Sequence, residues 1–325
     1  MARASAKKKP AAKPAAKPAK AARSDGALRR WVGWVFSPLK LCVLALCAAV
    51  WLFWPQVRNQ LPQLDELPEY QVTVDRVQVT PPPRWVPEDI VEKVFERAGF
   101  EQTLVLTDPQ LSEKIALAFH THPWIERLVQ VRKSFPARVT VDVVYREPVA
   151  MVEVPGGGYY PIDRFGYLLP NEDFSAADVE RYPLISNISS VPAGNLGESW
   201  GDPAVTGAAE LAAVLTASNE SGQSWWSTLG LKSIIAPRRM AAADEADDLQ
   251  YRLATSGGSQ IYWGRSPTTQ HPGEISVVKK LERIADYHQT WKGFDNSPTP
   301  ILIDIRPWQG SRRTQLAAEP GPARQ

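Results

Sequence analysis

The stretch HPWIERLVQVRKSFPARVTVDVVYREPVA, residues 122–150, decides the fold class of this chain. Apolar and polar residues alternate in two runs, at about 126–134 and 137–146, and Pro136 lies between them. Alternation with a period of two, together with the many valines, predicts two β-strands joined by a tight turn. The segment therefore predicts a β-hairpin with one buried face.

Two helical patterns and a further strand precede this hairpin. Residues 87–99 begin at Pro87 and stop at Gly99, and residues 108–120 begin at Asp108 and Pro109, which are typical helix boundaries. Apolar residues recur at helical spacing in both patterns, and residues 70–79 alternate as a strand does. The order β-α-α-β-β over 70–147 predicts a small α+β domain.

This part of the sequence resembles the polypeptide-transport-associated (POTRA) domain of the FtsQ/DivIB cell-division family. That family has a Pro-Trp-Val after the second helix, a Val-x-Arg-x-(Trp/Phe)-Pro turn, a strand ending Glu-Arg-x-Pro-Val-Ala, and then Ile-Asp-x-x-Gly. The matching residues are Pro123, Trp124, Val131, Arg132, Phe135, Pro136, Arg146, Pro148, Val149, Ala150, Ile162, Asp163 and Gly166. The departures are Tyr145 in place of the family's Glu, and Thr80 and three prolines in place of a Gly after the first strand. The resemblance is close over 72–170, absent over 172–248 and faint over 249–308.

The N-terminal part has a different composition. Residues 1–30 contain ten Lys and Arg residues against one acid, with AAKP repeated, which predicts a basic disordered cytoplasmic tail. Residues 31–55 have one charged residue, Lys40, and a Trp pair at each end, which predicts a transmembrane anchor. Residues 56–69 contain prolines and are expected to form a stalk.

The charge distribution orients the predicted anchor. Basic residues are concentrated before it and not after it, so the positive-inside rule places the N-terminus in the cytoplasm. The expected location is the bacterial inner (cytoplasmic) membrane, as a single-pass type II protein whose bulk is extracytoplasmic or periplasmic. The family resemblance implies the division septum within that membrane.

The remaining residues predict a second, β-rich domain at 148–309. Strand patterns occur at 148–154, 158–163, 249–255, 259–263 and 301–306, and helical patterns at 203–217 and 274–288. The glycines at 156–158 indicate a hairpin turn, residues 172–248 are interpreted as insertions around the β layer, and 310–325 as a disordered tail. The expected fold class is α+β, with a single N-terminal transmembrane helix, a POTRA-like domain and a β-rich domain with flanking helices.

The terminal strand carries the predicted partner site. Ile303, Asp304 and Arg306 resemble the family's Ile-Asp-Leu-Arg-Tyr, although Pro307 replaces the Tyr and suggests that the strand lies at an edge or ends there. In the family, small bitopic coiled-coil proteins (FtsB and FtsL) are the partners, and the resemblance implies that one adds a strand here. Asp304 and Arg306 share a strand face, so an internal salt bridge competes with a partner contact by Arg306. Arg306→Ala is expected to leave thermal stability nearly unchanged and to weaken partner binding.

The predicted function is that of a non-enzymatic scaffold of the bacterial divisome, which recruits and coordinates septal cell-wall assembly proteins. One alternative is an envelope protein that uses its POTRA-like domain in another transport or assembly complex. The other is a membrane-anchored serine hydrolase, because Gly197-Glu198-Ser199-Trp200-Gly201 matches G-x-S-x-G, with His271 or His288 as base.

No cofactor or metal is expected. His120 and His122 are two imidazoles without a third ligand, and both cysteines, Cys42 and Cys47, lie in the apolar segment. Nucleic acid is an unlikely partner, because only the tail is strongly basic.

Overall fold

The computed structural model describes residues 38–60, 64–100, 104–218, 222–238 and 248–316. The chain divides into two compact units, residues 1–63 and residues 64–325. The tail predicted at 1–30, and the first seven residues of the predicted anchor, lie outside the described residues.

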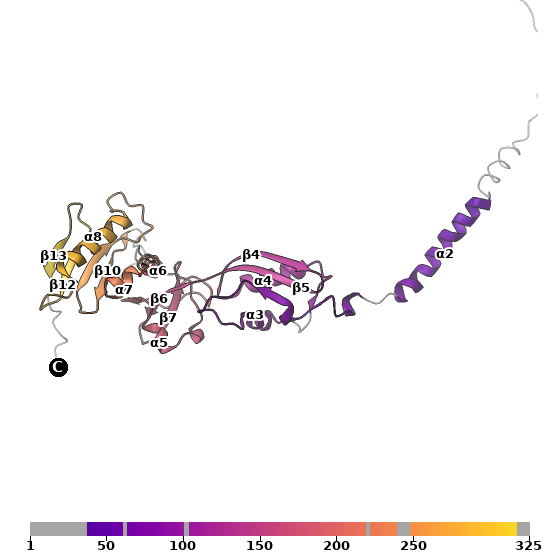
Figure 1. Cartoon of the computed structure of the whole chain (residues 1–325), viewed down its shortest axis with the longest axis horizontal. Coiled ribbons are helices and arrows are strands. Elements are labelled where there is room, and N and C mark those ends of the chain that lie inside the picture. Colours follow the sequence, from indigo (N-terminus) through magenta and orange to yellow (C-terminus); the bar gives the residue numbers. More distant parts are fainter. Residues whose placement is uncertain (1–37, 61–63, 101–103, 219–221, 239–247, 317–325) are drawn as a thin grey trace, which may run out of the picture. The chain divides into compact units, whose positions relative to one another are not determined.

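Helix α2, Pro38–Gln60, is the described element of the first unit (Figure 1). None of the helices in the described ranges is both long enough and apolar enough to cross a membrane, so the predicted transmembrane helix is wrong. Within these ranges the helix has 23 residues, but it includes Lys40 at its start and Gln56, Arg58, Asn59 and Gln60 at its end. The uninterrupted apolar run is 41–54, which is shorter than the roughly 20 residues that a span needs.

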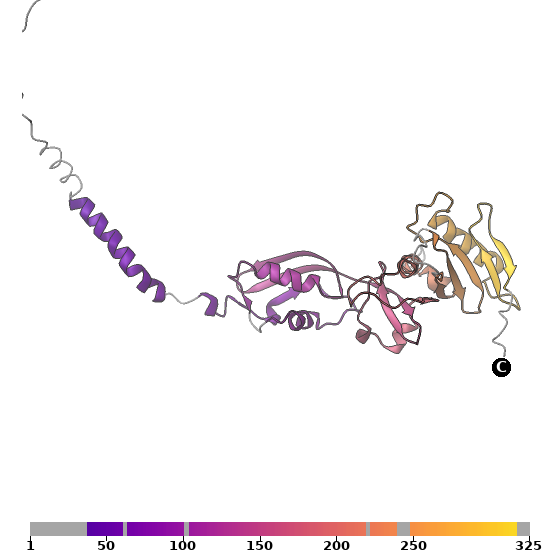
Figure 2. The same cartoon turned by 180° about the vertical axis from the view of Figure 1, so that it is seen from behind.

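The first part of the second unit contains the predicted strands and helices in the predicted order, with an additional short strand, β3 (Leu104–Val105), between the two helices. Strands β2 (Val77–Val79), β4 (Ile125–Ser134) and β5 (Arg138–Tyr145) form a three-stranded sheet in the order β2-β5-β4. Strand β4 runs antiparallel to β5, whereas β2 runs parallel to it, which is possible because a long connection that includes two helices separates β2 from β5. These helices are α3 (Ile90–Ala98) and α4 (Leu111–His120) (Figures 1 and 2).

The apolar stripes of α3 and α4 form the core of this domain with the valines of β5. The buried helix residues include Ile90, Val94, Ile115 and Phe119, and their partners on β5 are Val139, Val141 and Val143. Gly99 ends α3 in the left-handed conformation with φ 64°, as predicted from its position.

The strand predicted at 70–79 is interrupted. A 3-10 turn, Val74–Arg76, separates β1 (Gln71–Val72) from β2. Strand β1 pairs with the short β3 (Leu104–Val105) in a two-stranded sheet, while β2 joins the larger one. The turn therefore distributes one alternating run between two sheets.

The C-terminal part contains an eight-stranded sheet in the order β13-β12-β11-β10-β9-β8-β6-β7. Strands β6 (Pro148–Glu153) and β7 (Tyr159–Asp163) form the predicted hairpin, with Gly156, Gly157 and Gly158 at positive φ in its turn. Strands β10 (Tyr251–Thr255), β11 (Gln260–Gly264) and β12 (Ile301–Asp304) lie close to their predicted positions. The α+β class is therefore observed, with a large sheet at its centre.

Residues 172–248 are not insertions around this sheet, because they supply two of its inner strands. Strand β8 (Leu184–Ser186) pairs with β6 and with β9 (Leu231–Ile235), and β9 also pairs with β10. The same region contains α5 (Ala176–Val179), α6 (Pro203–Thr216) and α7 (Trp225–Thr228). The sheet is continuous only because these strands connect β6 to β10.

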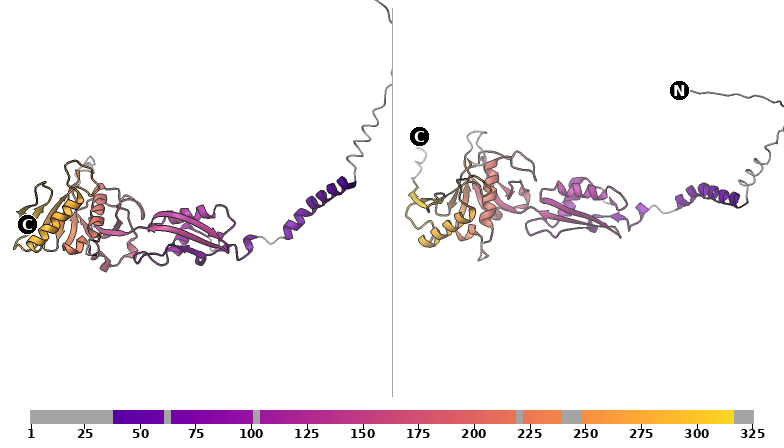
Figure 3. Two further views of the ribbon diagram at one scale, coloured as in Figure 1. Left: turned by 45° about the horizontal axis from the view of Figure 1, so that its top comes forward. Right: turned by 90° about the horizontal axis from the view of Figure 1, so that it is seen from above.

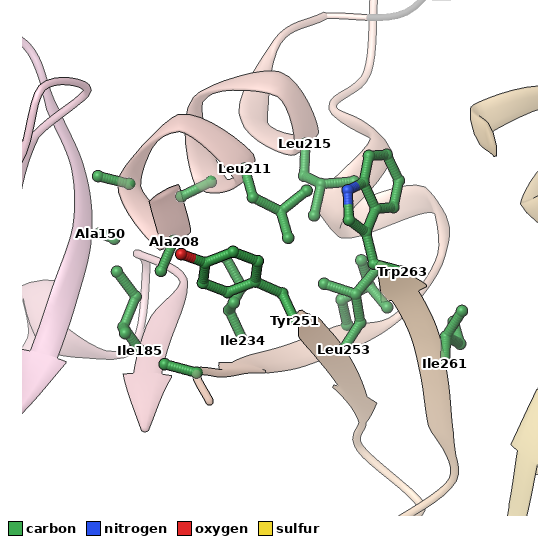
Figure 4. Close-up of a cluster of buried hydrophobic side chains, with 14 of the residues drawn as sticks. Ala150, Ile185, Ala208, Leu211, Leu215, Ile234, Tyr251, Leu253, Ile261 and Trp263 are labelled. Atoms are coloured by element: carbon green, nitrogen blue, oxygen red, sulfur yellow. The ribbon is translucent and has the colours of Figure 1, made fainter. Parts of the chain in front are cut away.

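Helix α6 packs on the sheet through small and branched side chains. Figure 4 shows Ala208, Leu211 and Leu215 of α6 directed toward Tyr251 on β10 and Trp263 on β11, and all of these residues are buried. Gly207 lets the helix approach closely, since a Cβ there would collide with the Tyr251 hydroxyl. Helix α8 (Val277–Trp291) lies against the C-terminal strands (Figure 3).

The C-terminal strands differ from the prediction in one respect that concerns function. Arg312–Gln315 forms β13, in a segment predicted to be a disordered tail, and pairs antiparallel with β12. Strand β12 is therefore flanked on both sides, by β11 and by β13. Of the two alternatives suggested by Pro307, an edge position is wrong, because β13 occupies the edge, whereas the strand does end before this proline, at Asp304.

Candidate protein-docking site

The candidate site is the edge of the large sheet at β13. All four residues of this strand, Arg312 to Gln315, are exposed. In the described ranges, β13 pairs with β12 and with no strand on its other side. An exposed strand with an unpaired side can accept a strand from another chain.

The register shows which backbone groups on β13 are free. Leu302 faces Thr314, and the Leu316 N–H donates to the Pro300 carbonyl at 3.0 Å, which directs the even-numbered N–H groups inward. Backbone groups alternate in direction along an antiparallel strand, so the N–H groups of Arg313 and Gln315 point away from β12. These two residues provide the hydrogen-bonding edge.

The position of the β12–β13 connection is fixed by helix α8. The Arg283 guanidinium donates to the carbonyl oxygens of Ile305 and Trp308, each at 2.7 Å, and to that of Pro307. Trp308 itself is 65% exposed beside these bonds. Arg283 is half-buried, and its bonds to three carbonyls of the connection hold the connection, and therefore β13, against the helix.

The edge carries positive charge. Arg313 lies over the Trp291 ring of α8, with its guanidinium carbon 5.0 Å from the ring centre, and Arg312 faces Asp304 across the ladder. A strand that adds here with acidic side chains would meet complementary charge.

The structure brings together two of the three predicted site residues. Arg306 donates to both carboxylate oxygens of Asp304, from Nε at 2.9 Å and from Nη2 at 2.8 Å, and also bonds to Gln250. Its guanidinium stacks 3.9 Å from the centre of the Tyr262 ring. These bonds from Arg306 hold the pKa of Asp304 below its ordinary value.

The structure changes two predictions, one for Ile303 and one for Arg306. Ile303 is fully buried in the core, so its side chain is not available to a partner. Arg306 is 34% exposed, and replacing it would also break contacts within this chain, so its stability effect is not negligible. The internal salt bridge, one of the two alternatives for Arg306, is present.

A buried ion pair between Arg146 and Asp163 connects the first domain to the eight-stranded sheet. Arg146, which follows β5, donates to Asp163 at the end of β7 over 2.6 Å, and the two side chains are 10% and 1% exposed. Asp163 also accepts the N–H groups of Phe165 and Tyr167, each at 2.9 Å. Arg146 lies 4.1 Å from the centre of the Tyr167 ring. The pair ties the three-stranded sheet to the eight-stranded sheet.

Ser199 of the G-x-S-x-G motif has no histidine beside it among the residues that the structure describes. It lines a hollow of about 360 Å³ with Glu210, Tyr251, Ser266 and Thr268, and no histidine is among the described lining residues. The Ser199 hydroxyl accepts from the Gly201 N–H at 3.4 Å, whereas His271 bonds to Gly273 and His288 contacts Phe294. Residues 187–198 form no strand, so the local geometry of a nucleophile elbow is missing.

Replacing Ser199 by alanine should leave function intact, because the hydrogen bond of its hydroxyl in the described part of the chain is one long contact, 3.4 Å, from the Gly201 N–H. The measurement is complementation of a depletion strain, with protein levels followed by immunoblot. Trp200→Ala is the matched comparison, since this neighbouring side chain is 1% exposed and its loss should cost about 3–5 kcal/mol of stability. Loss of complementation by Ser199→Ala at normal protein level would restore the hydrolase alternative.

The two histidines of the helix end differ in environment. His120 is exposed and His122 is buried, and no cluster of three metal-ligating side chains occurs among the described residues. Burial, reinforced by Arg97 and Lys93, lowers the pKa of His122 to about 4. His122 is therefore neutral at neutral pH, and its Nδ1 accepts the Trp124 N–H at 3.4 Å.

No family model matches this sequence, and no curated protein matches it.

Proposed function

We propose that this chain is a non-enzymatic docking protein of the bacterial division machinery, which recruits and coordinates the proteins that build the septal cell wall. The observation that carries this proposal is the open basic edge of the eight-stranded sheet at β13. The resemblance of residues 122–166 to the FtsQ/DivIB family supports the division role. Its proposed place in the cell is the division septum.

The mode of docking is strand addition. Arg313 and Gln315 offer N–H groups and carbonyls to an added strand, and Arg312 and Arg313 favour a partner strand with acidic side chains. The partners of this proposal are small coiled-coil division proteins of the FtsB and FtsL kind. The proposed site is on β13, the strand that pairs with Ile303 and Asp304 of β12. The Asp304–Arg306 ion pair lies on the β12 side of β13.

Gln315→Pro tests this mode of docking directly. Proline removes the outward N–H of residue 315, while the inner bond from Leu316 to Pro300 is kept. We expect the affinity of the full chain for an FtsB-like partner to fall at least tenfold. The measurement is the dissociation constant of the full chain from a partner immobilised on a sensor surface.

Gln315→Ala is the control, because it removes the same side chain and keeps the N–H. Its affinity should remain within twofold of the wild type. Equal affinities for the proline and alanine variants would show that the partner does not pair with β13.

A further inference from the structure

A second surface of the C-terminal domain has the form of a docking groove. It lies between α7 and α8 and has a volume of about 690 Å³. Its lining residues are Trp225, Thr228, Leu229, Val278, Leu281, Glu282, Ala285, Asp286, His288 and Gln289. None of them belongs to β13, and none is Arg306 or one of its hydrogen-bond partners Asp304 and Gln250.

The floor of this groove is apolar and continuous with the core. Leu229 is 3% exposed, and Trp225 and Leu281 are half-buried against the same core cluster. Val278 stands at the margin, 65% exposed. The floor therefore offers an apolar strip along one side of α8.

The rim of the groove is acidic. Glu282 and Asp286 are exposed and lie one helical turn apart on α8, and the described lining includes no Lys or Arg. Neither carboxylate forms an ion pair with any of the residues that the structure describes. Arg283, between them in sequence, is directed to the carbonyls of the β12–β13 connection.

Two like charges at this spacing repel each other on a helix. A cationic occupant would remove that repulsion while covering the apolar strip. The combination of an apolar floor and a negative rim defines the chemistry of the occupant more closely than either feature alone.

We propose that the α7–α8 groove binds a basic amphipathic helix of a partner protein. The partner's apolar residues, at i, i+3, i+4 and i+7, fill the strip over Leu229 and Leu281, and its Lys or Arg side chains pair with Glu282 and Asp286. The basic segment of this chain at 1–30 is a poor occupant, because it contains no aromatic residue and only Met1 and Leu28 as large apolar residues. The proposal is independent of strand addition at β13.

The probe is a fluorescein-labelled 18-residue synthetic helix of Leu and Lys, titrated with the full chain and followed by fluorescence anisotropy. Glu282→Lys with Asp286→Lys should weaken its binding at least tenfold. The matched control is Glu92→Lys with Glu96→Lys, which makes the same charge change at the same spacing on the exposed side of α3. The control should bind within twofold of the wild type.

A second pair of variants tests the apolar floor. Val278→Ser should weaken the probe at least threefold, whereas Val129→Ser, at a side chain 54% exposed on β4, should have no effect. Should the double lysine variant fail to fold, Glu282→Gln with Asp286→Gln replaces it, with an expected loss of at least threefold.

Three outcomes would overturn the proposal. One is equal weakening by the α8 and α3 charge pairs, and another is equal binding by the Val278 and Val129 variants. The third is binding of a synthetic peptide of residues 1–30 as tight as that of the Leu/Lys helix, since this would mean that the groove responds to charge alone. Retention of probe binding by Gln315→Pro would show that this surface acts separately from the β13 edge.

Discussion

Replacing Arg146 by alanine should lower the free energy of unfolding of the full chain by about 3–5 kcal/mol, because it leaves the buried Asp163 carboxylate without its cation. Arg146 Nη1 lies 2.6 Å from Asp163 Oδ2, and the two side chains are 10% and 1% exposed, so the carboxylate loses its counter-ion at a largely buried position. The loss should appear as a reduced denaturant midpoint in urea unfolding followed by tryptophan fluorescence.

Arg132→Ala is the matched control for this prediction. Arg132 pairs with Asp142 at 2.9 Å on the same sheet, but the two side chains are 57% and 36% exposed. Exposed pairs contribute about 0–1 kcal/mol, so this variant should unfold close to the wild type. Equal destabilisation by the two variants would mean that the Arg146–Asp163 pair does not tie the two sheets together.

Acidification from pH 7 to pH 4.5 should destabilise the wild type by about 2–3 kcal/mol more than it destabilises His122→Asn. Burial, with Arg97 and Lys93 as positive neighbours and Asp173 opposing them, lowers the pKa of His122 to about 4 from an ordinary value of 6.5. Between pH 6.5 and pH 4, His122 is protonated in the unfolded chain and remains neutral in the folded chain. The contribution of neutral His122 to the free energy of unfolding is therefore fully present above pH 6.5 and is lost as the pH falls toward 4.

Asparagine keeps an acceptor near the Trp124 N–H and removes the titrating group. His120→Asn, at the exposed position two residues earlier, should keep the wild-type dependence on pH. The measurement is the free energy of unfolding at both pH values for the three proteins. Parallel pH dependences for wild type and His122→Asn would show that His122 is not excluded from protonation in the fold.

The first domain could be predicted from sequence because its signals are local. Val139, Val141 and Val143 alternate on β5, and the stripes of α3 and α4 contain their buried residues at helical spacing. The buried partner of Arg146 could not be predicted in this way, because Asp163 is 17 residues away across a junction between two sheets. Only the resemblance to a known family drew attention to both residues.

The strands that complete the large sheet carried weaker signals. Strand β8 has three residues, too few for an alternating pattern, and β9 lies in a region of Ala, Ser and Gly. Strand β13, with the sequence RRTQ, has no apolar residue, since all of its side chains are exposed at the edge. The sequence pattern detects strands through their buried face, and β13 has none, so the residues of the docking edge were missed.

The apolar segment near the N-terminus led to an error of a different kind. Its Trp pairs and basic flank satisfied the pattern of a membrane anchor, but α2 begins at Pro38 and continues through polar residues to Gln60. None of the helices among the described residues is long and apolar enough to cross a membrane. By contrast, the internal salt bridge between Asp304 and Arg306 was one of the two predicted alternatives and is present, with Arg306 Nη2 2.8 Å from Asp304 Oδ2, although β12 ends at Asp304 and Arg306 lies beyond it.

The most direct test of the proposed function is the position of the protein in dividing cells. A functional fluorescent fusion of the full chain should form a band at the division site, and depletion of the protein should give filamentous cells without septa. A uniform distribution of the fusion, together with cells of normal length after depletion, would contradict the account.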